Sequence, residues 1–406
     1  MTTIQTVILI TAAILTLYAM KKGVNLGLIM LADTVFIALI TNMSLKNSLK
    51  YAFQGAFSEK TISLVLLLFL IMMMENIMRT TGMIKGMVGS LKELAGSNRV
   101  AAGFLPAVLG LLPSPGGARF SCPMVEEVAG NNSDASNKAF VNYWFRHIWM
   151  DGFILYPGFI LAAQLVGVSV ITLFMRMLPF ILGNVLLGTV FGVLFIKKEK
   201  IKSGRNKAES LKEFILSMLP IIILITLYTT LLKVTPYALE ISSAVVVSAL
   251  LAIKKYSFSK ILTTMRDAFP VKLVLIFVGV MVFKEVLFGS GVVNNLPGLM
   301  DAWRIPPVLL FMLLPFLAGF ATGITINFVS MTFPLLIPLG LGHNLWYAIM
   351  AFVSGSVGAM MTPLHLCAVM SADYFKMPLG KLLLKVGYAE CILLSVIVGL
   401  YYIIPA

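Results

Sequence analysis

The chain has 406 residues, of which 59% are hydrophobic and only 12% are charged. A soluble protein carries about 25% charged residues, so this composition excludes soluble enzymes, nucleic-acid-binding domains and disordered chains. The formal net charge of +14 is typical of basic loops beside a membrane and does not require a nucleic-acid partner. We therefore expect an all-α polytopic membrane protein whose main partner is the lipid bilayer.

Apolar segments long enough to cross a bilayer recur along the chain, because about 20 such residues span the hydrocarbon core. The predicted spans are 4–20, 24–41, 62–78, 139–165, 168–196, 213–232, 237–253, 271–289, 344–371 and 382–404.

Two further apolar stretches, 100–128 and 305–342, are each interrupted at the middle by small, polar and helix-breaking residues. This pattern predicts two half-helices joined by a loop, a re-entrant hairpin that enters and leaves the membrane on one side. Irregular backbone at that depth is tolerated only inside protein or beside a water-filled cavity.

The basic residues predict an orientation. If both hairpins return to their starting side, most of the 31 Lys and Arg residues fall on one side, including those of the stretch 197–212. The positive-inside rule makes that side cytoplasmic. We therefore expect a multi-pass protein of the cell (inner) membrane with both termini outside. The opposite side receives Lys46, Lys50, Lys60, Lys233 and Arg304.

The sequence also resembles itself at an offset of about 209 residues. LPAVLG at 105–110 falls on LPFLAG at 314–319, and Tyr156-Pro157 falls near Thr362-Pro363. We predict a first repeat at 1–197, a cytoplasmic linker at 198–212 and a second repeat at 213–406.

Each predicted repeat holds five transmembrane helices and one re-entrant hairpin. Because five is odd, the second repeat must be inverted relative to the first. Each repeat also contains a proline-broken span, at 139–165 and at 344–371. Inverted repeats with broken helices are typical of secondary transporters, whose substrate site lies where the repeats meet.

This arrangement resembles the ion transporter superfamily, which includes the citrate, dicarboxylate, gluconate, arsenite and sodium/proton permeases. PSPGGARFSCP (113–123) and SVGAMMTP (356–363) are most similar to its DUF401 branch. The resemblance covers nearly the whole chain and concerns architecture, not substrate. It implies an elevator-like motion in which 100–165 and 305–371 move together. The remaining spans would form a scaffold and a candidate homodimer surface.

The first hairpin tip carries an arginine beside a helix-breaking run. Prolines prevent helix continuation and glycines permit tight turns at Pro113-Ser114-Pro115-Gly116-Gly117. The freed amides and the following helix start favour an anion. Arg119 in this apolar segment is costly unless it faces a partner or a cavity. Either it binds an anionic substrate, or it forms a structural pair with Asp151 or Glu75.

The second tip, Thr322 to Asn327, offers hydroxyls, an amide and unwound carbonyls without charge. Such uncharged oxygen ligands suit Na⁺ or substrate oxygens, whereas interhelical hydrogen bonding is the alternative. The predicted substrate-binding residues of both tips and the second break are Ser114, Gly116, Gly117, Arg119, Ser121, Thr322, Gly323, Thr325, Asn327 and Thr362.

The broken spans supply the candidate coupling residues. Asp151 either takes up a proton or is held ionised by Arg146 as a structural pair. His365 is interpreted as a lone histidine, which is either a hydrogen-bonded core residue or a titrating residue that relays protons. The predicted ion-coupling residues are Asp151, Asn142, Asn327, Ser354 and Ser356.

We therefore expect a secondary active transporter of a small anion, an organic carboxylate, coupled to a Na⁺ or H⁺ gradient by alternating access. We expect no catalytic residues, no metal site and no cofactor, with Na⁺ as a candidate coupling ion. Two other classes remain as alternatives. One is an intramembrane enzyme, suggested by Glu126-Glu127, and the other is a channel for a small solute.

Overall fold

The computed structural model describes residues 11, 15–16, 18–111, 118–130, 133–150, 152–199, 206–294, 298, 304 and 306–403. All regular elements within these residues are helices, which confirms the all-α class. In the described part of the chain, five helical segments are long and apolar enough to cross a membrane, by length and composition. They are Leu45–Thr80, Val170–Phe195, Lys207–Leu231, Leu345–Tyr374 and Leu379–Ile403.

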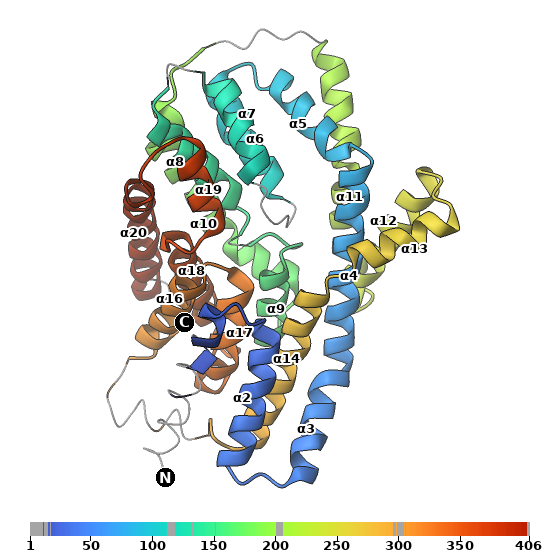
Figure 1. The fold of residues 1–406 in the computed structure, drawn as a ribbon, viewed down its shortest axis with the longest axis vertical. Helices are drawn as coiled ribbons and strands as arrows, with labels where there is room; N and C mark the ends of the chain where they lie inside the picture. Colours follow the sequence, from blue (N-terminus) through green and yellow to red (C-terminus); the bar gives the residue numbers. More distant parts are fainter. Residues whose placement is uncertain are drawn as a thin grey trace.

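Figure 1 shows the helices in their order along the chain. In the first part they are α2 (Leu26–Ile40), α3 (Leu45–Phe57), α4 (Glu59–Thr80), α5 (Met83–Leu94), α6 (Asn98–Gly110), α7 (Ala118–Ala129), α8 (Ala135–His147), α9 (Pro157–Val166), α10 (Val170–Phe191) and the short η1 (Val193–Phe195). In the second part they are α11 (Lys207–Leu231), α12 (Ala238–Ile253), α13 (Phe258–Ala268), α14 (Val271–Gly289), α16 (Pro307–Thr322), α17 (Thr325–Leu336), η2 (Ile337–Leu339), α18 (Leu345–Met361), α19 (Leu366–Tyr374) and α20 (Leu379–Ile403).

Polar residues at the helix starts explain several of these bounds. The side chain of Ser58 accepts a hydrogen bond from the backbone of Thr61 and so caps α4. Asp134 caps α8 in the same way, and Ser169 caps α10. Such caps satisfy backbone N–H groups that have no partner within the helix.

One group of helices packs through its backbones. A Cβ added to Gly27 of α2 would lie 2.0 Å from the carbonyl oxygen of Leu275 in α14, and one added to Gly55 of α3 would lie 2.6 Å from the Cα of Val282. Glycine is therefore required where α2 and α3 meet α14. In Figure 1 these helices lie together at the lower middle of the view.

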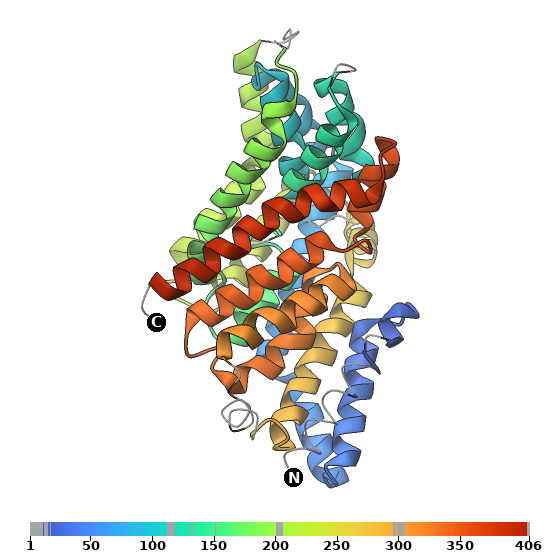
Figure 2. The same cartoon turned by 90° about the vertical axis from the view of Figure 1, so that its left-hand side faces the viewer.

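The predicted hairpin segments each hold a pair of contacting helices, α6 with α7 and α16 with α17. In Figure 1, α6 and α7 lie in the upper part of the view, and α16 and α17 lie below its middle. A Cβ on Gly319 of α16 would lie 2.1 Å from the carbonyl oxygen of Gly355 in α18. Figure 2 shows α20 running obliquely across the face formed with α18 and α10, both of which it contacts.

The helix ends inside the predicted broken spans have local causes. Tyr156 is extended (φ −81°, ψ 124°) and Pro157 opens α9, which suits proline at the first helical position. Thr362 is likewise extended (φ −83°, ψ 141°) after α18. It precedes Pro363, and a residue before proline is pushed out of the helical region.

Candidate functional site

Part of the predicted first tip falls outside the described residues. Ser114, Gly116 and Gly117 lie there, as does Asp151 of the first broken span, and the side chain of Arg119 is likewise outside them. Ser121 is fully buried in α7, where its hydroxyl donates to the carbonyl of Ala118 at 3.5 Å.

The second tip is a single left-handed turn between two helices. Gly323 ends α16 with a φ of +68°, a conformation that disfavours other residues. Thr325 and Asn327 are buried in the first turn of α17. The hydroxyl of Thr322 has no hydrogen-bond partner within the described residues. The turn therefore offers a buried hydroxyl whose hydrogen-bonding capacity is unused.

This turn contacts both broken spans beside the points where their helices are interrupted. A Cβ on Gly323 would lie 3.1 Å from the Cγ2 of Thr362 and 3.3 Å from the Cα of His365, in the second break. On its other side, a Cβ on Gly158 would lie 2.8 Å from the backbone nitrogen of Ile326. The second hairpin tip and the two broken spans thus meet at one place.

The end of α6 reaches the same region. The hydroxyl of Tyr156, in the first break, donates to the carbonyl of Gly110 at 2.5 Å. A Cβ on Gly110 would lie 2.2 Å from the carbonyl oxygen of Arg146. The helix that leads into the first tip therefore ends against the C-terminal turn of α8.

A buried polar network joins α8 to α7 and α19. The amide nitrogen of Asn142 donates to the hydroxyl of Ser371 at 2.8 Å and contacts the sulfur of Cys122 at 3.1 Å. Asn142 is completely buried, and its amide oxygen has no hydrogen-bond partner within the described residues. A buried acceptor left in this state is costly, so it is a candidate contact for a cation or for water.

The last turn of α8 carries three further buried polar side chains. The hydroxyl of Tyr143 donates to the carbonyl of Met360 at 2.9 Å. Arg146 is only 5% exposed, and it lies within electrostatic range of both His147 and His365. This end of the helix therefore places a guanidinium group beside two imidazoles in the interior.

The two histidines contact each other, which corrects the reading of His365 as a lone histidine. Their Nε2 atoms are 3.0 Å apart. The Nδ1 of His147 is 2.6 Å from the carbonyl oxygen of Tyr143, and that of His365 is 2.8 Å from the carbonyl oxygen of Ala359. The sequence did place one histidine beside each predicted break, and this shared position was the available signal.

The remaining predicted residues lie on α18 and just after it. The hydroxyl of Ser354 donates to the carbonyl of Met312 at 2.8 Å and so ties α18 to α16. Ser356 is 1% exposed, and its hydroxyl has no partner within the described residues. The Thr362 hydroxyl accepts from the backbone of Leu364 at 3.2 Å. The hydroxyl of Ser354 is therefore used in packing α18 against α16, whereas the hydroxyl of Ser356 is the one of the two that could still bind a ligand.

Several carboxylates that the sequence made candidates for a functional role form ion pairs. Glu75 pairs with Arg79 at 3.3 Å, so this carboxylate already has a cation beside it. Glu126 pairs with Lys138 at 2.8 Å, and Glu127 pairs with Lys92. The two glutamates that suggested an enzyme thus point to different lysines.

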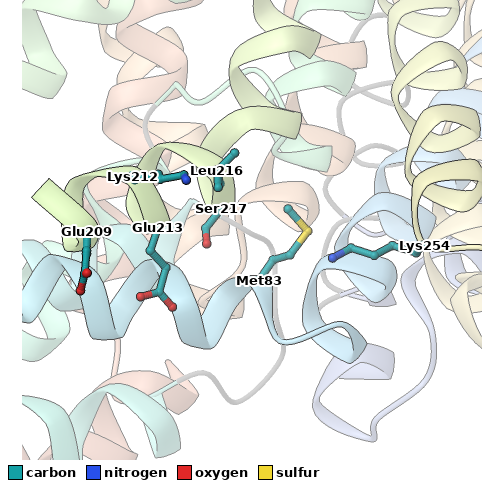
Figure 3. Close-up of a pocket in the computed structure, with 7 residues that line it drawn as sticks. All are labelled: Met83, Glu209, Lys212, Glu213, Leu216, Ser217 and Lys254. Carbon is teal, nitrogen blue, oxygen red and sulfur yellow. The ribbon is translucent and has the colours of Figure 1, made fainter.

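A separate pocket of about 310 Å³ lies between α5, α11 and the end of α12. Figure 3 shows Glu209 and Glu213 pointing from α11 toward α5, with Lys254 approaching Met83 from the other side. The pocket carries charges of both signs and includes no residue of the predicted tips or breaks.

Comparison with protein families matches residues 3–404 to the family described as "Protein of unknown function (DUF401)". A comparison with curated proteins gave no match. Since the match covers nearly the whole chain, this protein belongs to the DUF401 family.

Proposed function

We propose that this protein is a secondary active transporter that moves a small anion, an organic carboxylate, using a Na⁺ or H⁺ gradient. The observation that carries the proposal is the meeting of the second hairpin tip with both broken helices, at Gly323, Gly158 and Thr362. Unwound backbone inside an apolar helical protein is tolerated where it lines a cavity or a buried site. In transporters, such breaks hold the substrate and the coupling ion.

A repeated element order supports the two-repeat organisation. Apart from α5, the helices from α2 to α10 have counterparts in the same order from α12 to α20 within the described residues, with α6 and α7 corresponding to α16 and α17, and α8 and α9 to α18 and α19. Contacts recur as well. α2 packs on α14 as α12 packs on α4, and α9 packs on α17 as α19 packs on α7. Reciprocal contacts of this kind are what a two-fold relation between the halves would produce.

Residues with positive φ add independent support. Gly82 and Gly291 both follow the corresponding helices α4 and α14, with φ of +79° and +71°. Further pairs recur at nearly the same spacing along the chain. They are Asn42 with Lys255, Gly96 with Arg304, Gly130 with Gly340 and Gly167 with Lys376. Left-handed turns are rare outside glycine, so their recurrence supports a common backbone in both halves.

The inversion of the second repeat rests on the odd number of spans assigned to each. The link to the ion transporter superfamily rests on this inversion together with the hairpins. We propose that both hairpins are re-entrant and that 1–197 and 213–406 are the inverted repeats.

The polar chemistry favours an anion. Arg146 is buried near the breaks, and Arg119 lies in the first turn of α7. A guanidinium group can bind a carboxylate through two parallel hydrogen bonds. The hydroxyls of Thr322 and Ser356 would supply uncharged contacts to the same substrate or to a coupling ion.

The packing supports an elevator-like movement. The hairpin and broken helices pack with one another, through α6 with α8, α16 with α18 and α9 with α17. A second group, which includes α2, α3, α4, α12 and α14, also packs within itself. These two groups meet at α4 with α9 and at α14 with α17, and helices α5, α10 and α20 also contact the first group, at α6, α8, α9 and α18. We propose that the first group slides along these contacts.

The test is transport by the purified protein in liposomes, after a thermal-shift screen of organic and inorganic anions with and without Na⁺ has identified a substrate. A carrier gives saturable uptake that follows the ion gradient, and preloaded substrate accelerates exchange. A non-saturable flux without counterflow would identify a channel. Chemical conversion of the substrate would identify an enzyme. Either result would overturn the proposal.

A further inference from the structure

The contact between His147 and His365 has an unusual hydrogen-bond requirement. Each Nδ1 lies within 2.8 Å of a backbone carbonyl oxygen, and a carbonyl oxygen only accepts. Each Nδ1 must therefore carry a proton. A neutral imidazole has one N–H group, so both Nε2 atoms then present lone pairs to each other at 3.0 Å.

The two Nδ1–carbonyl contacts and the Nε2–Nε2 contact each need a proton or a cation between the two atoms. Two neutral imidazole rings supply only two protons. The third contact needs either an additional proton or a metal ion between the Nε2 atoms. In a tetrahedral site with metal–nitrogen distances of about 2.0–2.1 Å, two imidazole nitrogens lie about 3.3 Å apart. The observed separation of 3.0 Å differs from this by a few tenths of an ångström.

Cys367 favours the metal. Its sulfur and the ligand nitrogens of the two histidines all lie within 4.8 Å of one another. A shared proton would not require a thiol here, whereas two imidazoles and a thiolate form a donor set that zinc prefers. Hydrogen bonds from Nδ1 to backbone carbonyls are also the usual outer support of histidines that bind metal through Nε2.

We propose that His147, His365 and Cys367 form a binding site for a divalent transition-metal ion of the Zn²⁺ class, with a fourth position left for water or another small ligand. This proposal rests on the geometry of three side chains and does not depend on the transport function. His147 ends α8, His365 lies between α18 and α19, and Cys367 lies in the first turn of α19. A bound ion would therefore link the first broken span, through His147, to the second, through His365 and Cys367.

A metal ion and a shared proton would place the same net charge in this site. A Zn²⁺ ion with one thiolate adds the same net charge as one shared proton, since binding deprotonates the cysteine. Arg146 lies within electrostatic range of both rings and opposes either cation equally. The ring of Tyr143 packs against both imidazoles in T-shaped arrangements, with centroids 4.8 and 5.2 Å away.

Co²⁺ provides the test, because a thiolate bound to it gives a near-ultraviolet charge-transfer band. The purified full chain is stripped with a chelator, reduced and titrated with Co²⁺, and Zn²⁺ is then added to compete. We expect the wild type to show the band and Zn²⁺ to abolish it. Cys367→Ser should lose the band and bind Co²⁺ more weakly. His147→Gln and His365→Gln should weaken binding by more than the ~10- to 100-fold that follows loss of an outer partner.

The chain contains its own matched controls. His343, in the loop before α18, and Cys391, on α20, are both exposed, so His343→Gln and Cys391→Ser should bind Co²⁺ as the wild type does. Melting temperatures in chelator check that each variant is folded, and Cys367→Ser changes the least volume. The proposal is wrong if the wild type gives no thiolate band, or if the control variants weaken binding as much as the site variants do.

Discussion

The amide nitrogen of Asn142 and the hydroxyl of Ser371 lie 2.8 Å apart, although 229 residues separate them along the chain. This hydrogen bond holds α8 against α19 and orients the amide oxygen of Asn142, which has no partner within the described residues. The amide oxygen of Asn142 is therefore held in a fixed position and can still coordinate a cation.

The first prediction concerns this oxygen. If Asn142 binds the coupling Na⁺, a Na⁺ concentration of about ten times the Kd stabilises the wild type by about 1.4 kcal/mol. Asn142→Ala should abolish that Na⁺-dependent rise in melting temperature. Ser371→Ala should lower the melting temperature and weaken the Na⁺ effect without abolishing it, because the oxygen remains but loses the hydrogen bond that orients the amide. Asn47→Ala, at an exposed asparagine of α3, is the control. A Na⁺ response retained in Asn142→Ala would exclude this residue.

The second prediction concerns the hairpin turn. Gly323→Ala places a side chain at a φ of +68° and 3.1 Å from Thr362. The left-handed conformation alone costs about 1–2 kcal/mol, so the melting temperature should fall. Transport should decrease as well, because Thr362 or the tip must shift. Gly89→Ala, in α5 with nothing within 4 Å, should stabilise by roughly 0.5–1 kcal/mol. Equal effects of the two substitutions would contradict this account of the turn.

The third prediction concerns orientation. In a cysteine-free background, Val234→Cys, which lies at an 81% exposed position, should react with a membrane-impermeant maleimide in intact cells. Lys198→Cys should react only after the cells are opened, because basic loops remain cytoplasmic. Cysteines placed in 79–99 should behave like the one at 198. The reverse pattern would invert the topology, and labelling within 79–99 alone would exclude a re-entrant first hairpin.

The fourth prediction concerns Arg119. If it binds a substrate carboxylate, Arg119→Gln removes a charge-assisted hydrogen bond worth about 1.5–3 kcal/mol, or roughly 10- to 150-fold in affinity. Arg119→Lys should lose less, because it keeps the charge but not the planar fork. Arg176→Gln, at an exposed arginine of α10, should change nothing. Unchanged affinity together with a collapsed melting temperature would identify Arg119 as half of a structural pair.

The helical class could be predicted from the sequence because it depends on composition and on local residues. Pro157 and Pro363 act on the backbone beside them, so helix ends near these positions follow without knowledge of the tertiary structure. The resemblance to DUF401 is confirmed by the family match. Repeat orientation, transport and the assigned substrate residues stay predictions.

The polar contacts could not be predicted in the same way. His147 and His365 are 218 residues apart in sequence, and neither lies in a motif that specifies the other. Ser371 and Cys122 read as ordinary residues of apolar segments, yet both contact Asn142. Such pairs depend on which helix faces pack together, and hydrophobic periodicity gives little information on this where helices are apolar on all sides.

The contact between Gly319 of α16 and Gly355 of α18 has a consequence for any movement of the second hairpin. Side chains can absorb a small displacement between two helices by changing rotamer, but two backbones in direct contact have no such freedom. A displacement of the turn at Gly323 is therefore expected to move α18 and the break at Thr362 with it. If a substrate binds at the turn as proposed, its binding or release would therefore move the turn and the break at Thr362 together.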